Sequence, residues 1–292
     1  MTIPVLLLPL LVAITLAIAV TTVHRRLPPV LAARAVTVTL VAIATAAVPT
    51  VWILALGYLA HDPLLGKGLR WCAETFGVHQ RVPAWVGIPA LAIGLAGSIR
   101  AGKVLRTHRR LRLDLPGSIE IADHEQAFAV TLPGRGGRVV LSTALVELLD
   151  EQGQAVVVAH ESAHALHRHD RYLLIAQVAS ATVPLLRPLT SRLQFSLERW
   201  ADEAAVADCG DRQLVARTLA AVALHRFAPA GTALSFTGLG VPARVAALLA
   251  APPRPPRWSV QVGLWLAIGF TGAFAAYQLH HLAGLISSLC PD

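Results

Sequence analysis

The chain has 292 residues, of which 55% are hydrophobic and only 14% are charged, and its mean hydropathy is +0.59. This composition is typical of a protein embedded in a bilayer, and it excludes both an ordinary soluble globular chain and a disordered one. Three cysteines are too few for a disulfide scaffold.

The net charge of +8 is concentrated in two short segments. Residues 24–34 contain three arginines, residues 100–112 contain six cationic residues, and neither segment contains an acidic residue. Because these charges together exceed the net charge, the rest of the chain is close to neutral. Both segments adjoin long apolar stretches, where cationic residues set membrane orientation and meet anionic lipid. The distribution therefore predicts contact with membrane lipid and no direct binding of nucleic acid.

Four uncharged stretches are long enough to cross about 30 Å of hydrocarbon. They are Ile3–Val23, Ala35–Ala60, Val82–Ile99 and Trp258–Leu279. The first stretch has its arginines after the apolar run instead of before it, so we expect a retained helix and not a signal peptide. A buried soluble hairpin formed by the first two stretches is the alternative, but neither shows an amphipathic stripe.

The spans and the charges together predict one topology. Residues 1–105 form three transmembrane helices (about 3–23, 35–60 and 82–105), residues 106–257 form a cytoplasmic domain with its own core, and residues 258–292 form a fourth helix and a short outer tail. The excess of cationic residues in the inner segments places both termini outside the cell membrane. Cys72 and Cys290 then share the outer side, where a disulfide is permitted, and two unpaired cysteines are the alternative.

Within the insert, short β segments at 127–132 and 138–142 flank a Pro-Gly-rich turn, which is typical of a hairpin. Ser142 is a candidate N-cap for the helix that follows. The helices expected from the pattern cover 143–149, 154–169, 193–207 and 212–226, and a stiff Pro-rich connector covers 252–256.

The second of these helices contains the sequence His160-Glu161-Ser162-Ala163-His164. Chance would produce an H-E-x-x-H in a chain of this composition roughly 0.01 times. Histidines four residues apart share one helix face and can bind one Zn²⁺, while the glutamate beside them can polarise a water at the metal. The alternative, two ordinary polar positions on a surface helix, fits poorly with the apolar turn that precedes them.

A catalytic zinc needs a third protein ligand, and two residues compete for that role. Asp170 has the metzincin spacing, but His167 stands where that pattern requires glycine, and the chain lacks the later methionine. Glu198 lies on a separate predicted helix, four residues before Asp202. One of these carboxylates can bind the metal while the other accepts the outer N–H of a histidine ligand, which is a gluzincin arrangement. Glu203 and Asp208 are less suitable, because Glu203 points away from the Glu198 face and Asp208 lies beyond the predicted helix.

The order of these motifs resembles that of the membrane-bound M48 and M56 metallopeptidases. The resemblance includes the hairpin, His160–His164, Glu198-x-x-x-Asp202 and Pro242-Ala243-Arg244-Val245. The layout of three spans, a domain and one span is most similar to the M56 family of β-lactam sensor-transducers, without their extracellular sensor, and M48 is the near alternative. The implied fold class is an α-helical membrane protein with an α+β gluzincin-type zinc metallopeptidase domain inserted between transmembrane helices 3 and 4.

The resemblance also implies roles for individual residues. His160, His164 and Glu198 would be the zinc ligands, Glu161 the general base and Asp202 a partner of a ligand. Arg244 would support the site or the substrate, with a solvated surface charge as the alternative, and His225 is a weaker candidate for stabilising the oxyanion. His167 and His169 are expected to be polar surface residues, because the ligand set is complete without them.

The expected activity is hydrolysis of a cytoplasmic or juxtamembrane protein, with an extended substrate lying along the free edge of the strand Val139–Thr143. The M56 resemblance makes a transcriptional repressor the leading substrate and signalling the leading role. The alternatives are M48-like quality control of membrane proteins and a non-catalytic signalling scaffold. Self-association of the chain is left open.

Overall fold

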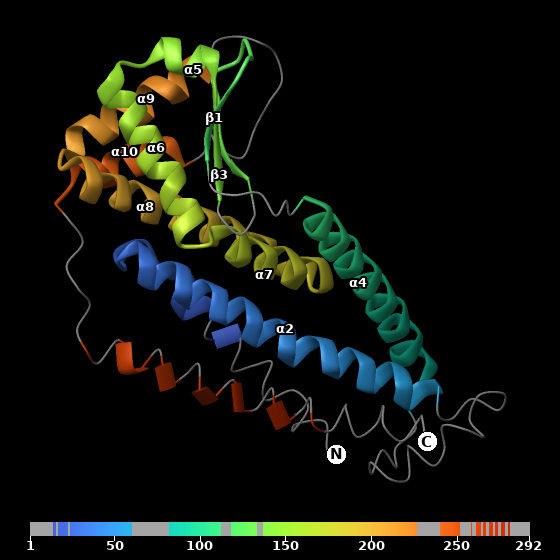
Figure 1. Ribbon diagram of the computed structural model, residues 1–292. Helices are drawn as coiled ribbons and strands as arrows, with labels where there is room; N and C mark the ends of the chain where they lie inside the picture. Colours follow the sequence, from blue (N-terminus) through green and yellow to red (C-terminus); the bar gives the residue numbers. More distant parts are fainter. Residues whose placement is uncertain are drawn as a thin grey trace.

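The computed structural model is mostly helical, with a small sheet at one end (Figure 1). It describes residues 14–59 except 16 and 23, residues 82–111, 118–132, 137–226 and 240–251, and scattered positions between 258 and 280. The described positions of the first and fourth expected spans are helical. The loop 61–81, Cys72, Cys290 and the connector 252–256 lie outside the described residues, so the disulfide stays untested.

Two helices, α2 (Pro29–Leu59) and α4 (Ala84–Leu111), are long and apolar enough to cross a membrane. A buried core helix also meets this criterion of length and composition. The two helices differ in exposure, because 44% of the apolar window of α2 is buried but only 22% of that of α4. The exposed side chains of α4 include Trp85, Ile88 and Ile93. An apolar surface of this kind is expected where a helix faces lipid.

Small residues let α4 approach α2 closely. A Cβ atom on Gly94 would lie 3.2 Å from the ring of Trp52, and one on Gly87 would overlap Tyr58. Close contact through glycine is a common way to pack membrane helices, where the hydrophobic effect does not drive association. The two long helices therefore pack closely, with Trp52 and Tyr58 of α2 against the glycines of α4.

The sheet has three strands, β1 (Ile119–Ala122), β2 (Ala129–Leu132) and β3 (Arg138–Ser142), in the order β1-β3-β2. Strands β2 and β3 pair antiparallel, with Leu132 opposite Arg138, which confirms the predicted hairpin. Strand β1 was not predicted and pairs parallel with β3. The prediction of a free edge on Val139–Thr143 is therefore wrong, because β3 is the central strand and both of its edges are paired.

The helices of the insert follow the sheet. They are α5 (Thr143–Leu148), α6 (Glu151–Leu166), α7 (His169–Thr182), the short η2 (Pro184–Leu186), α8 (Arg187–Cys209), α9 (Arg212–Arg226) and α10 (Val241–Leu249). Ser142 caps α5 as predicted, because its side chain accepts the backbone N–H of Leu145. The predicted helix over 154–169 is wrong at its end: α6 stops at Leu166, and Arg168, at a φ of 53°, turns the chain into α7. Asp208 belongs to α8, contrary to expectation.

The largest apolar core joins α2 to the insert. Val36 and Leu40 of α2 pack in one cluster with Leu193 and Leu197 of α8, and with the apolar face of α7. Arg199 of α8 also donates to the backbone carbonyl of Arg25, in the turn before α2, at 3.3 Å. Within residues 106–257, which were expected to form a domain of their own, α8 is therefore buried against a helix that was assigned to the membrane region.

Candidate metal centre

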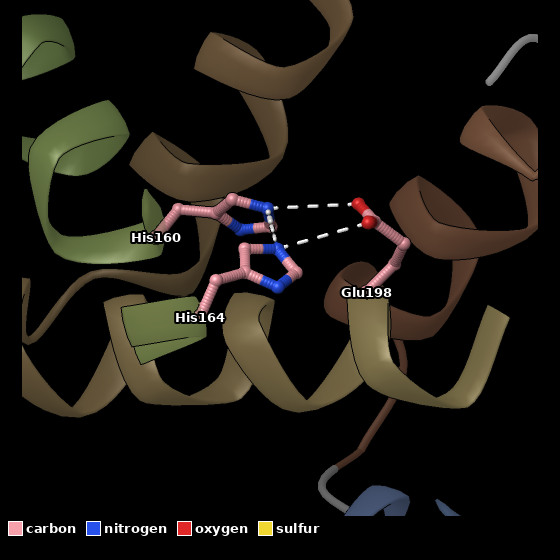
Figure 2. A group of neighbouring side chains, drawn as sticks. All are labelled: His160, His164 and Glu198. Carbon is pink, nitrogen blue, oxygen red and sulfur yellow. Dashed lines mark hydrogen bonds and ion pairs between the residues drawn. The ribbon is translucent and has the colours of Figure 1, made fainter. Parts of the chain in front are cut away.

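Two helices from different parts of the chain bring three potential metal ligands together. His160 and His164 lie one turn apart on α6, and Glu198 projects toward them from α8 (Figure 2). One potential ligand atom from each residue lies within 4.8 Å of the other two. The Nε2 atoms of the histidines are 3.2 Å apart, and the carboxylate oxygens of Glu198 lie 3.6 Å and 3.7 Å from them.

The second nitrogen of His160 is fixed by a buried carboxylate. Its Nδ1 lies 3.2 Å from Oδ1 of Asp202, one turn after Glu198 on α8. A proton on Nδ1 that is donated to Asp202 leaves the lone pair of Nε2 directed at the other two ligands. Asp202 is in turn held by Arg244 of α10, whose Nε and Nη2 donate to the two carboxylate oxygens at 2.8 Å and 2.6 Å.

Arg244 also reaches the third ligand. Its Nη1 lies 2.8 Å from Oε2 of Glu198, so one guanidinium joins Glu198 and Asp202. The side chain is buried and only 8% of the residue is exposed, which rules out the alternative of a solvated surface charge. A bidentate arginine–carboxylate pair fixes orientation as well as charge. Arg244 thus determines where both carboxylates of α8 point.

His164 has a partner that the sequence analysis missed. Its Nδ1 lies 2.8 Å from Nδ1 of His169, the first residue of α7, and His169 is only 1% exposed. The expectation that His169 is a polar surface residue is therefore wrong. His169 is buried because the chain turns at Arg168 and brings the start of α7 against His164 near the end of α6. His167 is half-buried and stacks on Trp200, with ring centroids 4.7 Å apart.

Glu161 lies beside the ligands and touches the sheet. The hydroxyl of Thr131 in β2 is 2.7 Å from the backbone carbonyl of Glu161 and 2.7 Å from its Oε2. Gly137, just before β3, presses against Ala165 of α6 at a φ of 63°, where a side chain would overlap the Ala165 Cβ. Both contacts hold the hairpin against the helix that carries the H-E-x-x-H sequence; the Pro-Gly-rich turn predicted the hairpin but not its contact with that helix.

Burial and neighbouring charges set the protonation states of the cluster. Burial opposes the charged form of His160, but hydrogen bonds and the charges of Asp202 and Glu198 raise its pKa to about 10. Burial likewise opposes ionisation of Glu198, yet His160 and Arg244 hold its pKa well below its usual range. Burial lowers the pKa of His164, and burial together with His164 lowers the pKa of His169 to about 3. The carboxylates thus stay ionised while His164 and His169 stay neutral.

The other residues singled out by sequence are not members of this group of potential ligands. Glu203 faces Arg212, which binds it at 2.7 Å and 2.9 Å, and so supplies no ligand. His225 is exposed near the end of α9, and Asp170 lies in the first turn of α7. Among the acidic residues considered for the third ligand or its partner, Glu198 belongs to the group and Asp202 contacts His160.

Two imidazole nitrogens and one carboxylate are the donors that zinc binds in catalytic sites, where a fourth position stays open. The residues present fit Zn²⁺ in a second respect, because each histidine has a partner on its outer nitrogen. Fold and site together are those of a candidate metallopeptidase.

Comparison with known proteins points the same way. The sequence profile of peptidase family M48 matches residues 104–196, which include the H-E-x-x-H sequence and end two residues before Glu198. This similarity indicates a metallopeptidase domain and supports the M48 alternative, whereas no comparison supports M56 specifically. No curated protein and no solved structure matches the chain.

Proposed function

We propose that this protein is a membrane-anchored zinc endopeptidase of the gluzincin type. The observation that carries the proposal is the convergence of His160, His164 and Glu198 within 4.8 Å, from two separate helices. These three residues would hold Zn²⁺, which lowers the pKa of a water and polarises a peptide carbonyl. The similarity to peptidase family M48 supports this reaction class.

Glu161 is the proposed general base. It follows a ligand on α6, and its carboxylate contacts Thr131, which restricts the directions it can take. In the reaction Glu161 accepts the proton of the attacking water and returns it to the leaving nitrogen. Asp202 and Arg244 keep the ligands in place and take no part in the transfer of the proton.

The substrate edge that fits this site is β2. Only one edge of β2 is paired among the described residues, and Thr131 of this strand lies against Glu161. An extended peptide added antiparallel or parallel to β2 would present its backbone carbonyls beside the general base. Recognition through main-chain hydrogen bonds accepts loops of unrelated sequence, so we propose extended segments of cytoplasmic or juxtamembrane proteins as substrates.

Two biological roles of the proposed cleavage are considered. Cleavage of a transcriptional repressor follows from the M56 resemblance, and removal of damaged membrane proteins follows from the similarity to M48. The match to residues 104–196 favours the second role. The proteins that accumulate when the base is removed distinguish the two roles.

The decisive variant is Glu161→Gln. It is compared with wild type in two ways: by the proteomes of cells that express each protein, and by the zinc content and activity of each purified protein. Because Glu161 is a base and not a ligand, we expect about one zinc per chain in both proteins and loss of cleavage only in the variant. Glu198→Gln is the contrasting variant, in which metal content and activity fall together. Purified wild type without zinc, or a fully active Glu161→Gln protein, would refute the proposed reaction.

A further inference from the structure

The turn between α7 and α8, residues Thr182–Pro188, is here named the α7–α8 tip. It lies against the middle of α4, where a Cβ atom on Gly97 would be 3.2 Å from the carbonyl oxygen of Thr182. Beyond this contact the chain turns through η2 and presents Leu185 to the surroundings. Leu185 is 88% exposed, more than any other large apolar side chain among the described residues.

The tip contacts α4 near the point where its sequence changes from apolar to basic. Gly97 is three residues before Arg100, the first of the basic residues, which corresponds to about 4.5 Å along the helix. On the other side of Gly97, Ile88 and Ile93 are more than half exposed, at 54% and 55%. If α4 crosses a bilayer, its surface passes from hydrocarbon to phosphate at the height of the tip.

The charges of the segment suit an anionic membrane surface. Residues 171–197 contain Arg171, Arg187 and Arg192 and no acidic residue. Arg187 is exposed two residues from Leu185. An apolar side chain that enters the leaflet beside an arginine at the phosphates is a common arrangement at membrane interfaces.

We propose that the α7–α8 tip inserts into the cytoplasmic leaflet, with Leu185 among the acyl chains and Arg187 at the lipid phosphates. This inference rests on the proposed membrane anchoring through α4. It adds a second point of attachment, placed within the sequence between the histidine ligands and Glu198.

The second attachment defines a substrate class for the proposed peptidase. Glu198 lies eleven residues after Arg187 on the same helix, so it stands at most about 17 Å from the lipid surface. At the end of α7 far from the tip, His169 begins the helix and contacts His164. A metal centre fixed at this height reaches peptide segments soon after they leave the bilayer, which favours juxtamembrane substrates over freely diffusing ones.

The test measures depth with a fluorophore on single cysteines, in full-length protein reconstituted into vesicles of phosphatidylcholine and phosphatidylglycerol. Cys72, Cys209 and Cys290 are replaced by serine, and Leu185→Cys is labelled with an environment-sensitive dye. Leu224→Cys on α9 is the matched control, because Leu224 is also highly exposed, at 74%. Ile93→Cys reports on α4 itself.

We expect lipids brominated on their acyl chains to quench the dye at positions 93 and 185 by at least twofold and to leave position 224 unaffected. Quenching at 93 without quenching at 185 overturns the inference and leaves the membrane anchor intact. Absence of quenching at both positions refutes the anchor and the inference with it. Equal quenching at 185 and 224 also overturns the inference, because it shows no preference for the tip.

Discussion

His169 determines which nitrogen of His164 is free to bind a metal. If Nε2 of His164 faces the metal, its Nδ1 carries the proton and donates it to Nδ1 of His169. The proton of His169 then resides on Nε2, which is buried and has no hydrogen-bond partner among the described residues. An unsatisfied buried donor costs about 1–3 kcal/mol, so the fold gives up stability to orient a ligand.

This reasoning predicts opposite effects of His169→Phe on metal binding and on stability. The variant keeps a ring beside Trp200 but removes both the acceptor and the unsatisfied donor. We expect zinc affinity to fall by about 10–100-fold. Melting of the metal-free protein should occur at the same temperature or higher. Chelator competition and thermal unfolding measure the two effects.

His167→Phe is the control for this prediction, since His167 stacks on Trp200 in the same cluster. The control should bind zinc like wild type. If His169→Phe lowered stability and left zinc affinity unchanged, His169 would be a packing residue and not a positioning residue.

The pKa of His160 predicts a coupling between pH and metal binding. In the metal-free protein this pKa is about 10, against an ordinary value of 6.5, so the protonated ring stabilises the fold fully below pH 6.5. That contribution is lost as the pH rises through 10. Zinc must displace the same proton, so between about pH 7 and 9 the apparent affinity should rise roughly tenfold per pH unit.

Calorimetry in buffers of different ionisation enthalpy measures this proton directly. We expect about one proton released per zinc ion at pH 8. Asp202→Asn removes the main acceptor that raises the pKa of His160, so it should release clearly less. Zinc binding without proton release in wild type would contradict the assignment of the charged ring.

At the scale of elements, α10 holds the orientation of α8 through Arg244. Asp202 is only 3% exposed, and in Arg244→Met it would lose both bonds from the guanidinium and keep only His160 as a partner. Removing one member of a buried pair typically costs about 3–5 kcal/mol of unfolding free energy. Denaturant unfolding measures the loss, and zinc affinity should fall with it because Glu198 is released as well.

Two companion variants test this assignment. Arg212→Met removes a more exposed arginine of α9, which binds Glu203 of α8 and the carbonyls of Ala247 and Leu248, and should cost less than Arg244→Met because these partners are less buried than Asp202. The double variant Arg244→Met with Asp202→Leu should recover most of the stability but not the zinc affinity. A double variant as unstable as the single one would show that Arg244 acts through packing alone.

The sequence predicted those parts of the site that depend on spacing within one helix. Four-residue periodicity alone places His160 beside His164 and Glu198 on one face with Asp202. It could not predict the turn at Arg168, since no glycine or proline marks it. The pairing of Asp202 with Arg244, 42 residues later, is a tertiary contact that no local pattern encodes. The same is true of the parallel pairing of β1 with β3.

At the scale of the whole molecule, the apolar helix α2 forms part of the core that supports α8. Ala33, Val36 and Leu40 of α2 are each no more than 1% exposed, in the same core as Leu193 and Leu197 of α8. The helix that carries Glu198 is therefore supported from below by α2 (Figure 1). A displacement of α2 would therefore reach Glu198 through this shared core, without passing through a linker.

The shared core makes a prediction about the isolated domain. A fragment of residues 106–257, cut at the boundary that the sequence favours, would expose the α2-facing side of α7 and α8 to water. Each large aliphatic side chain left unburied costs about 1.5–3 kcal/mol, which for four or more residues is comparable to the whole stability of a domain. We expect this fragment to aggregate or to stay partly unfolded, and to bind less than one zinc per chain.

A longer fragment of residues 24–257, purified in detergent, keeps α2 and α4 and is the matched control. It should show cooperative unfolding and bind about one zinc per chain, because the core and all ligands are present. Tryptophan fluorescence also separates the fragments once Trp52, Trp71 and Trp85 of the longer one are replaced by Phe, since Trp200 lies in the shared core and only 9% of it is exposed. Its emission should shift to longer wavelength when α2 is missing. A soluble, zinc-binding 106–257 fragment with a blue-shifted Trp200 would show that α2 is only an anchor.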